Sequence, residues 1–313
     1  MLKRFLTGMV IMVLLVGSFA LRFVSPYIFD GFLGVVIIFS AFEVATVLKK
    51  NNRPNDLYFV LAYPVLIYLS LLFCKSQKIG FLGYFAITIG LAVLLFCVTL
   101  VLNLILKKKT NKEMAETVFV GTRKKYVFIK SIRNLFLMAY PTFILSMLFV
   151  LNHIKWFNAF ASITGNIEFL ILVLLFATTI MTDTMAYLGG SAIGGPKLCP
   201  KISPNKTIMG AISGLIASVA TSLLLFVLFN SIAAYRDMMT AQNMTIVAFV
   251  IYGLLASVFS QFGDIFASLV KRQNNVKDYG WIFPGHGGFM DRVDGVSFNA
   301  VFSLIFFAIL LSI

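Results

Sequence analysis

Charged residues, and acidic residues above all, are scarce in this chain of 313 residues. Asp and Glu together number 12, and only 12% of the sequence is charged, against 60% that is hydrophobic. A soluble core of this length cannot bury so much apolar side chain, so the composition excludes a soluble protein. The apolar runs also lack the alternating pattern of membrane barrel strands. The sequence therefore predicts an all-α integral membrane protein, because helices satisfy their backbone hydrogen bonds within the bilayer.

Cysteine is also rare. Cys74, Cys97 and Cys199 are far apart and have no paired spacing. They predict neither a metal site nor a disulfide framework. The sequence also lacks repeats, low-complexity linkers, a soluble domain and any pattern typical of an acylation triad.

Nine apolar runs are long enough to cross a hydrocarbon core about 30 Å thick. The fifth run contains Pro141, so we expect that helix to be kinked or short. The predicted membrane helices are at about residues 5–24, 28–48, 57–73, 81–106, 134–151, 163–182, 208–229, 245–263 and 296–313.

The 26 Lys and Arg residues are unevenly distributed among the connecting loops. If the N-terminus is cytoplasmic, 21 of them fall on the cytoplasmic side and five on the other. Cytoplasmic loops are enriched in Lys and Arg, so the pattern predicts a cytoplasmic N-terminus and an outside C-terminus. The net charge of +14 is then explained by loops facing an anionic leaflet, and we expect no nucleic-acid partner.

Two segments have alternative interpretations. Lys3-Arg4, an apolar run and Ser18-Phe19-Ala20 also describe a cleaved secretory signal, although we expect an uncleaved anchor. In the basic 107–133 loop, Thr117-Val-Phe-Val120 can form a short amphipathic element at the membrane surface. We expect instead that this loop is solvated and only fixes the topology.

We divide the chain at residue 134. Residues 1–133 hold four predicted membrane helices and the basic loop, and residues 134–313 hold five more. The second part also has two cytoplasmic segments rich in polar residues, 183–210 and 264–294. The latter gathers four of the 12 acidic residues, four basic residues, one of the two histidines and four glycines. So dense a polar cluster beside membrane helices is a candidate functional site.

Helical spacing organises the beginning of the 264–294 segment. If the eighth helix continues past its apolar run, one face of its end carries a carboxylate, a hydroxyl and two cations. These four residues are Asp264, Ser268, Lys271 and Arg272.

The rest of this segment combines a glycine turn with an acidic helix start. Gly285-His286-Gly287-Gly288 supplies backbone that can approach a ligand closely or bind an anion. Asp291 and Asp294 are neighbours on one helix face. Carboxylates and cations together are what Mg²⁺-assisted phosphoryl or nucleotidyl transfer needs. Simpler explanations are helix-terminal charges, interfacial anchors, a tight turn and a structural histidine.

The 183–210 segment begins with Asp183 and four glycines. Lys197, Lys201 and Ser203-Pro-Asn-Lys206-Thr207 follow. Glycines with Lys and Ser or Thr can cradle phosphate, but the spacing of a P-loop is absent. Ser203 or Thr207 is a candidate cap of the seventh helix, and a helix N-terminus beside a lysine is also an anion site.

The motifs of these segments resemble a known family. Residues 268–294 follow the pattern S-x-V-K-R, four residues, K-D-x-G, then F-P-x-H-G-G-F-x-D-R-V-D. This is similar, without a departure, to the signature of the phosphatidate cytidylyltransferases, also called CDP-diacylglycerol synthases. Residues 183–207 resemble the family's second motif more loosely, and Ala41-Phe-Glu43 resembles a weak family feature. The second motif departs from the family at four positions. Ile180 and Ile208 stand where Trp is expected, Gly195 stands where Lys is frequent, and Met209 stands where Glu or Gln is expected.

The resemblance implies that CTP and phosphatidate react, with one or two Mg²⁺ ions, to give CDP-diacylglycerol and pyrophosphate. It implies metal binding by Asp264, Asp291 and Asp294, and a catalytic set of Lys271, Arg272, Asp264 and Asp291. The expected substrate-binding residues are Ser203, Lys206, Thr207, Asp183, Ser268, Lys277, Asp278, His286, Gly287, Gly288 and Arg292.

The expected surroundings follow from the same resemblance. The partners are CTP, phosphatidate and membrane lipids, and a homodimer is left open. The active site is expected on the cytoplasmic side of a multi-pass membrane protein, in the inner membrane if the cell is bacterial. A CTP-dependent polyprenol kinase is the nearest alternative. A transporter is less favoured, because the ionisable residues collect at one interface rather than in the middle of several spans.

Overall fold

The protein is helical throughout, apart from one hairpin of two short strands among the described residues. The structure is a computed structural model that describes residues 2–50, 53–117, 121–163, 165–283, 285 and 287–312. The predicted all-α class is confirmed. In chain order the elements are α1 (Leu2–Arg22), α2 (Pro26–Lys50), α3 (Leu57–Ser76), α4 (Phe81–Ile105), α5 (Lys107–Glu116), α6 (Arg123–Leu137), η1 (Met138–Phe143), α7 (Ile144–Asn152), η2 (Ile154–Trp156), η3 (Asn158–Phe160), α8 (Ile167–Ile193), β1 (Lys197–Cys199), β2 (Ser203–Thr207), α9 (Ile208–Asn230), α10 (Ala233–Ala241), α11 (Ile246–Gln273) and α12 (Met290–Leu310).

Within the described ranges, eight helical stretches are long and apolar enough to cross a membrane. They correspond to the second to ninth predicted spans, and the first coincides with α1, of which the stretch Gly8–Arg22 is described with its side chains. Only 17% of the apolar window of α4 and 22% of that of α9 is buried, as expected of helices that face lipid tails. The protein is thus a multi-pass membrane protein, while nine crossings and the sides of the termini stay predictions.

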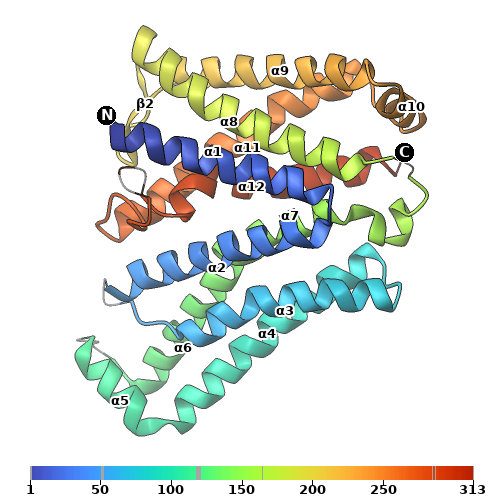
Figure 1. Ribbon diagram of the computed structural model, residues 1–313. Helices are drawn as coiled ribbons and strands as arrows, with labels where there is room; N and C mark the ends of the chain where they lie inside the picture. The colour runs from blue at the N-terminus through green and yellow to red at the C-terminus, as the bar shows by residue number, and fades with distance from the viewer. Residues whose placement is uncertain are drawn as a thin grey trace. The chain divides into compact units, whose positions relative to one another are not determined.

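The chain forms two compact units. Unit 1 is Met1–Ser146 with Asn274–Arg292, and unit 2 is Met147–Gln273 with Val293–Ile313. In unit 1, α2 packs against both α1 and α3, and α3 packs against α4 (Figure 1). The two units are defined by packing. The division at residue 134 was defined by the position of the predicted catalytic loops, so it stays a separate prediction.

The helix that contains Pro141 is interrupted, as predicted. Tyr140 has extended backbone angles (φ −124°, ψ 121°) inside the π-helical turn η1, between α6 and α7. A proline ring crowds the residue before it and moves that residue out of the helical region. The kink therefore follows directly from the sequence.

The prediction of a solvated loop at 107–133 holds only in part: most of its basic side chains are exposed, but α5 and α6 occupy most of the segment and Lys130 is buried. Lys130 is 1% exposed, and its Nζ lies 2.6 Å from Asp56 Oδ1 and 2.7 Å from Glu113 Oε2. Two carboxylates thus neutralise the buried ammonium group. Of the segment 117–120, residues 118–120 lie outside the described residues.

Small and hydroxylated residues bring the helices of unit 2 together. Ser218 Oγ donates to Gly253 O at 2.6 Å, which joins α9 to α11. Asn299 Nδ2 donates to Thr179 Oγ1 at 2.8 Å, which joins α12 to α8. Helices in lipid gain little from hydrophobic burial against each other, so close backbone approach and hydrogen bonds determine their packing.

Candidate active site

A close crossing of α8 and α9 in unit 2 positions the first residues of the site. A Cβ atom on Gly210 would lie 2.6 Å from Ala186 O, and one on Gly214 would lie 2.8 Å from Thr182 O. Both distances are too short for any side chain, so glycine is required at these positions. The crossing places the C-terminal half of α8 directly beside the first turns of α9.

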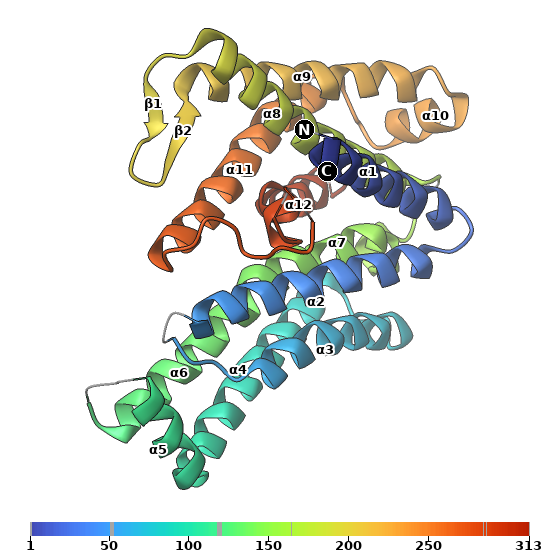
Figure 2. The same cartoon turned by 60° about the vertical axis from the view of Figure 1, so that its left-hand side comes forward.

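A hairpin connects these two helices (Figure 2). After α8 ends at Ile193, Gly194 (φ 72°) and Gly195 (φ 97°) adopt backbone angles that favour glycine. Strands β1 and β2 then pair antiparallel, and Thr207 Oγ1 accepts the N–H of Gly210 at 3.1 Å. Of the two predicted caps of the seventh membrane helix, Ser203 and Thr207, the structure shows Thr207 in that role.

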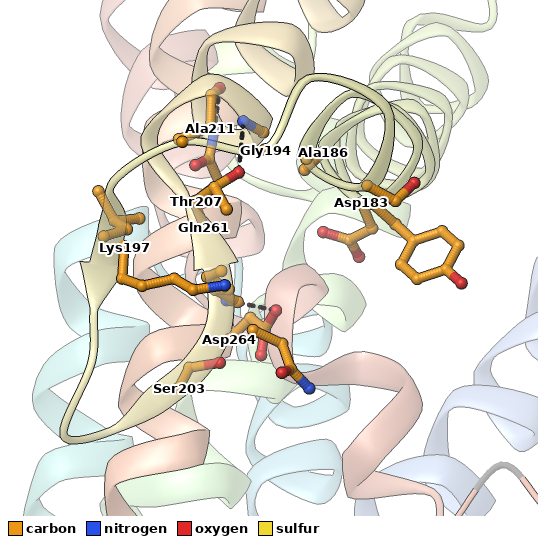
Figure 3. Close-up of a pocket in the computed structure, with 17 residues that line it drawn as sticks. Asp183, Ala186, Gly194, Lys197, Ser203, Thr207, Ala211, Gln261 and Asp264 are labelled. Atoms are coloured by element: carbon orange, nitrogen blue, oxygen red, sulfur yellow. Dashed lines mark hydrogen bonds and ion pairs between the residues drawn. The ribbon is translucent and has the colours of Figure 1, made fainter.

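The hairpin and the helices α8, α9 and α11 line a cavity of about 580 Å³. Asp183 and Asp264 point into it from α8 and α11, and Lys197 extends into it from β1 (Figure 3). The cavity contains four of the predicted substrate-binding residues, namely Asp183, Ser203, Lys206 and Thr207, together with Asp264. Its wall thus joins two carboxylates and two lysines to a capped helix N-terminus.

An ion pair crosses this cavity. Lys206 Nζ lies 2.5 Å from Asp264 Oδ2, and their side chains are 25% and 31% exposed. Ser268 Oγ, one turn further along α11, is 3.4 Å from Asp264 Oδ1. Because α11 continues to Gln273, the prediction that the eighth helix extends past its apolar run is confirmed. Since the pair is partly exposed, a phosphate that enters the cavity can reach the Lys206 ammonium group.

Further charges lie at the end of α11 and the beginning of α12. Asp294 is 8% exposed, and its charged neighbours are Asp264, Lys271 and Asp183. Arg272 Nε donates to Ile202 O in the hairpin at 3.3 Å. Unit 2 therefore brings together most of the predicted catalytic and metal residues, with Lys271 beside the carboxylates.

The remaining predicted residues belong to unit 1, in the loop between α11 and α12. Phe283 N donates to Gly287 O at 2.9 Å and closes a tight turn, in which Gly285 has φ 80° and Gly287 φ 81°. The N–H groups of Tyr279 and Gly288 both bind Asp291 Oδ2, at 2.8 Å and 2.9 Å. The glycine turn is thus confirmed. Lys277, Asp278 and Arg292 are exposed in this unit, and His286 lies outside the described residues.

Comparison with known proteins agrees with this architecture. A sequence model of the Cytidylyltransferase family matches residues 2–310. The chain belongs to this family. It is 44% identical over 141 residues to a phosphatidate cytidylyltransferase of Brucella abortus, a match that covers 45% of this chain and 48% of that protein.

Two further relatives carry the same name. A phosphatidate cytidylyltransferase of Thermotoga maritima is 34% identical over 138 residues, which are 44% of this chain and 49% of that protein. One from Staphylococcus saprophyticus is 37% identical over 127 residues, 41% of this chain and 45% of that protein. The chain thus spans about half the length of the curated relatives it matches.

The Mg²⁺ that the signature implies fits the donor chemistry of unit 2. Asp264 and Asp183 are charged neighbours of Asp294, and carboxylate oxygens are the ligands that Mg²⁺ prefers. No group of three or more metal-ligating side chains is found among the described residues. Mg²⁺ sites usually combine one or two carboxylates with waters and substrate phosphates, so a complete protein cage is not required.

The sequence predicted no role for two residues that belong to the described parts of this cytidylyltransferase-family site. Gln261 lines the cavity, and it lies three residues before Asp264 on the same face of α11, so helical spacing could have found it. Glu43 on α2 accepts N–H groups from Phe289 and Met290 in unit 1. The sequence marks it as an acidic residue inside an apolar run, within the Ala41-Phe-Glu43 run that resembles a weak family feature, but it predicts no contact with the signature.

Proposed function

We propose that this protein transfers a cytidylyl group from CTP to phosphatidate and so produces CDP-diacylglycerol and pyrophosphate. The observation that carries the proposal is the cavity of unit 2, where the Lys206–Asp264 ion pair lies beside the capped start of α9. A helix N-terminus with a lysine is suited to phosphates, and nearby carboxylates are suited to Mg²⁺. Membership of the Cytidylyltransferase family and the names of the relatives support the same substrates.

The proposed reaction needs no nucleophile from the protein. A phosphate oxygen of phosphatidate attacks the α-phosphorus of CTP and forms a new P–O bond. The bond between the α-phosphorus and the oxygen that bridges to the β-phosphate breaks, and pyrophosphate leaves with that electron pair. The protein has to bring two polyanions together, align them and stabilise the charge that develops.

The residues of unit 2 divide this work. Lys206 holds CTP phosphates beside the positive end of the α9 dipole, and Ser203 and Lys197 extend the same wall of the cavity. Asp264 keeps Lys206 oriented until a phosphate replaces it as the partner. Lys271 and Arg272, at the end of α11, bind the phosphate of the lipid. Lys277 and Arg292 stay predicted phosphate ligands.

Asp264 and Asp294 are the residues of unit 2 that would hold Mg²⁺, with Asp183 as their charged neighbour. When bound, the ion would neutralise phosphate charge and make the α-phosphorus more electrophilic. Asp291 stays a predicted ligand, because its signature position and not the geometry of unit 2 supports it.

We further propose that the site faces the cytoplasm, in the inner membrane if the cell is bacterial. The predicted topology puts both segments of the site, 183–210 and 264–294, on the side with most of the Lys and Arg residues. CTP reaches the protein from that side, and the lipid substrate is already in the membrane.

CTP that carries an isotope label at one known phosphate tests the proposed reaction. Purified protein in detergent micelles with phosphatidate and Mg²⁺ is given CTP labelled at either the α- or the γ-phosphate. We expect the α label to enter the lipid and the γ label to leave as pyrophosphate. Asp264→Asn should lower the transfer rate by about tenfold or more.

Asp237→Asn is the matched control, because it removes the same charge from the exposed helix α10 of unit 2. It should transfer label at the unaltered rate. Folded protein that leaves the α label in water would contradict the proposal. Entry of the γ label into a lipid, with release of CDP, would reassign the protein to the lipid kinases.

A further inference from the structure

Glu43 is a buried carboxylate far from the signature in sequence but in contact with it in unit 1. The residue lies on α2, within an apolar helix, and is only 4% exposed. A carboxylate in such surroundings is costly unless hydrogen bonds satisfy it. Phe289 N donates to its Oε1 at 3.1 Å, and Met290 N donates to its Oε2 at 3.0 Å. Each oxygen therefore binds one backbone N–H group.

These two N–H groups are at the start of α12, where the helix offers them no acceptor. The first N–H groups of any helix need partners from outside, and the positive end of the helix dipole favours a negative one. Asp291 Oδ2 binds the N–H of Gly288 directly before them. Two carboxylates thus bind three consecutive backbone N–H groups of the signature, those of Gly288, Phe289 and Met290.

Two glycines of the signature, Gly280 and Gly288, leave the space that the Glu43 carboxylate occupies. A Cβ atom on Gly280 or on Gly288 would collide with the Glu43 carboxylate. Phe39, one turn earlier on α2, stacks on Phe289 with ring centroids 5.1 Å apart. The loop therefore fits closely around this one side chain, which explains two glycines of the motif without a ligand.

We infer that Glu43 is a positioning residue of the active site, and this inference rests on the proposed function. By holding the N–H groups of Phe289 and Met290, it fixes the first turn of α12, from which Asp291 and Arg292 project. It also fixes the loop that carries Gly287 and Gly288. The first membrane helices thus contribute to catalysis through a residue that need not touch a substrate.

Glu43→Gln tests the inference with little change of shape. The amide keeps one acceptor oxygen but presents its NH₂ group to the second N–H, so one hydrogen bond is lost. We expect amide hydrogen exchange in residues 279–290 to become faster by about tenfold or more, with unchanged exchange elsewhere. The kcat of cytidylyl transfer should fall by about tenfold, while the KM for CTP stays within about threefold, because the cavity of unit 2 is unaltered.

Glu43→Asp keeps the charge but is one methylene shorter, so it should show the same local effect to a smaller or equal extent. Asp30→Asn is the matched control, since Asp30 is a 3% exposed acid on the same helix that binds Tyr68 OH instead. It should change neither local exchange nor kcat.

The exchange and kcat measurements separate failure of this inference from failure of the proposed function. Unaltered exchange at residues 279–290 in Glu43→Gln, or an unaltered kcat, would overturn the positioning role. Faster exchange over the whole chain would also overturn it, because Glu43 would then support general stability. If the unmodified protein transfers no cytidylyl group, the proposed function fails, whereas the exchange experiment still decides whether Glu43 holds the loop.

Discussion

Asp291 and Asp294 are neighbours on α12, yet they have different surroundings. Asp291 Oδ2 accepts the N–H groups of Tyr279 and Gly288, whereas Asp294 has the charge of Asp264 beside it. Their spacing alone predicted one role for both. The structure adds a loop-stabilising role for Asp291, beside its predicted role as a metal ligand.

Asp291→Asn separates the two roles. The Asn side-chain oxygen can accept the same N–H groups, so the loop should persist, whereas the negative charge that attracts Mg²⁺ is lost. We expect cytidylyl transfer at ordinary Mg²⁺ to fall by about tenfold or more and to recover in part at higher Mg²⁺. A Mg²⁺ titration of the transfer rate, with hydrogen exchange at 279–290, measures both effects. Near-normal turnover would remove Asp291 from the catalytic set.

The helices of the site are longer than the apolar runs that predicted them. α11 continues to Gln273 rather than ending at residue 263, and α12 begins at Met290 rather than at residue 296. Hydropathy marks the part of a helix that contacts lipid, whereas backbone hydrogen bonds continue into the polar interface. The site residues lie on these polar extensions, so periodicity could place them on faces although hydropathy could not.

The burial of Lys130 within the segment 107–133 was not predicted, for a different physical reason. Lys130 looked like a cytoplasmic surface charge because its partners, Asp56 and Glu113, are distant in sequence. The contact between Glu43 and the signature could not be predicted for the same reason, since Glu43 lies 246 residues from Phe289. Local spacing carries no information on such pairs. The motifs identified the chemistry, and the long-range contacts that support it required the structure.

Lys130→Met tests the importance of the buried ion pairs for unit 1. Removal of the ammonium group leaves two carboxylates close together in a poorly hydrated place, and the loss of one partner of a buried pair costs about 3–5 kcal/mol. We expect a clearly lower unfolding temperature in detergent. Lys112→Met is the control, since its 4.0 Å pair with Glu116 is 79% and 64% exposed and contributes at most about 1 kcal/mol. Equal melting of the two variants would contradict a stabilising role.

On the scale of the whole molecule, charge is the strongest signal of orientation. Of the 26 Lys and Arg residues, 21 fall on one side of the predicted topology. An additional or missing span would exchange the sides of every later loop and remove this asymmetry. The count of nine includes α1, the helix of which only the stretch Gly8–Arg22 is described with its side chains.

Reporter fusions to the 313-residue chain test the five crossings predicted after α5. With nine crossings and a cytoplasmic N-terminus, the C-terminus after α12 lies outside. Alkaline phosphatase fused there should be active in bacterial cells, because it folds only outside the cytoplasm, whereas green fluorescent protein exported there in unfolded form should stay dark. The same reporters inserted after Glu116 of α5, on the predicted cytoplasmic side, should give the opposite pattern. Fluorescence at both positions would mean an even number of crossings between Glu116 and the C-terminus, and it would contradict the five crossings predicted there.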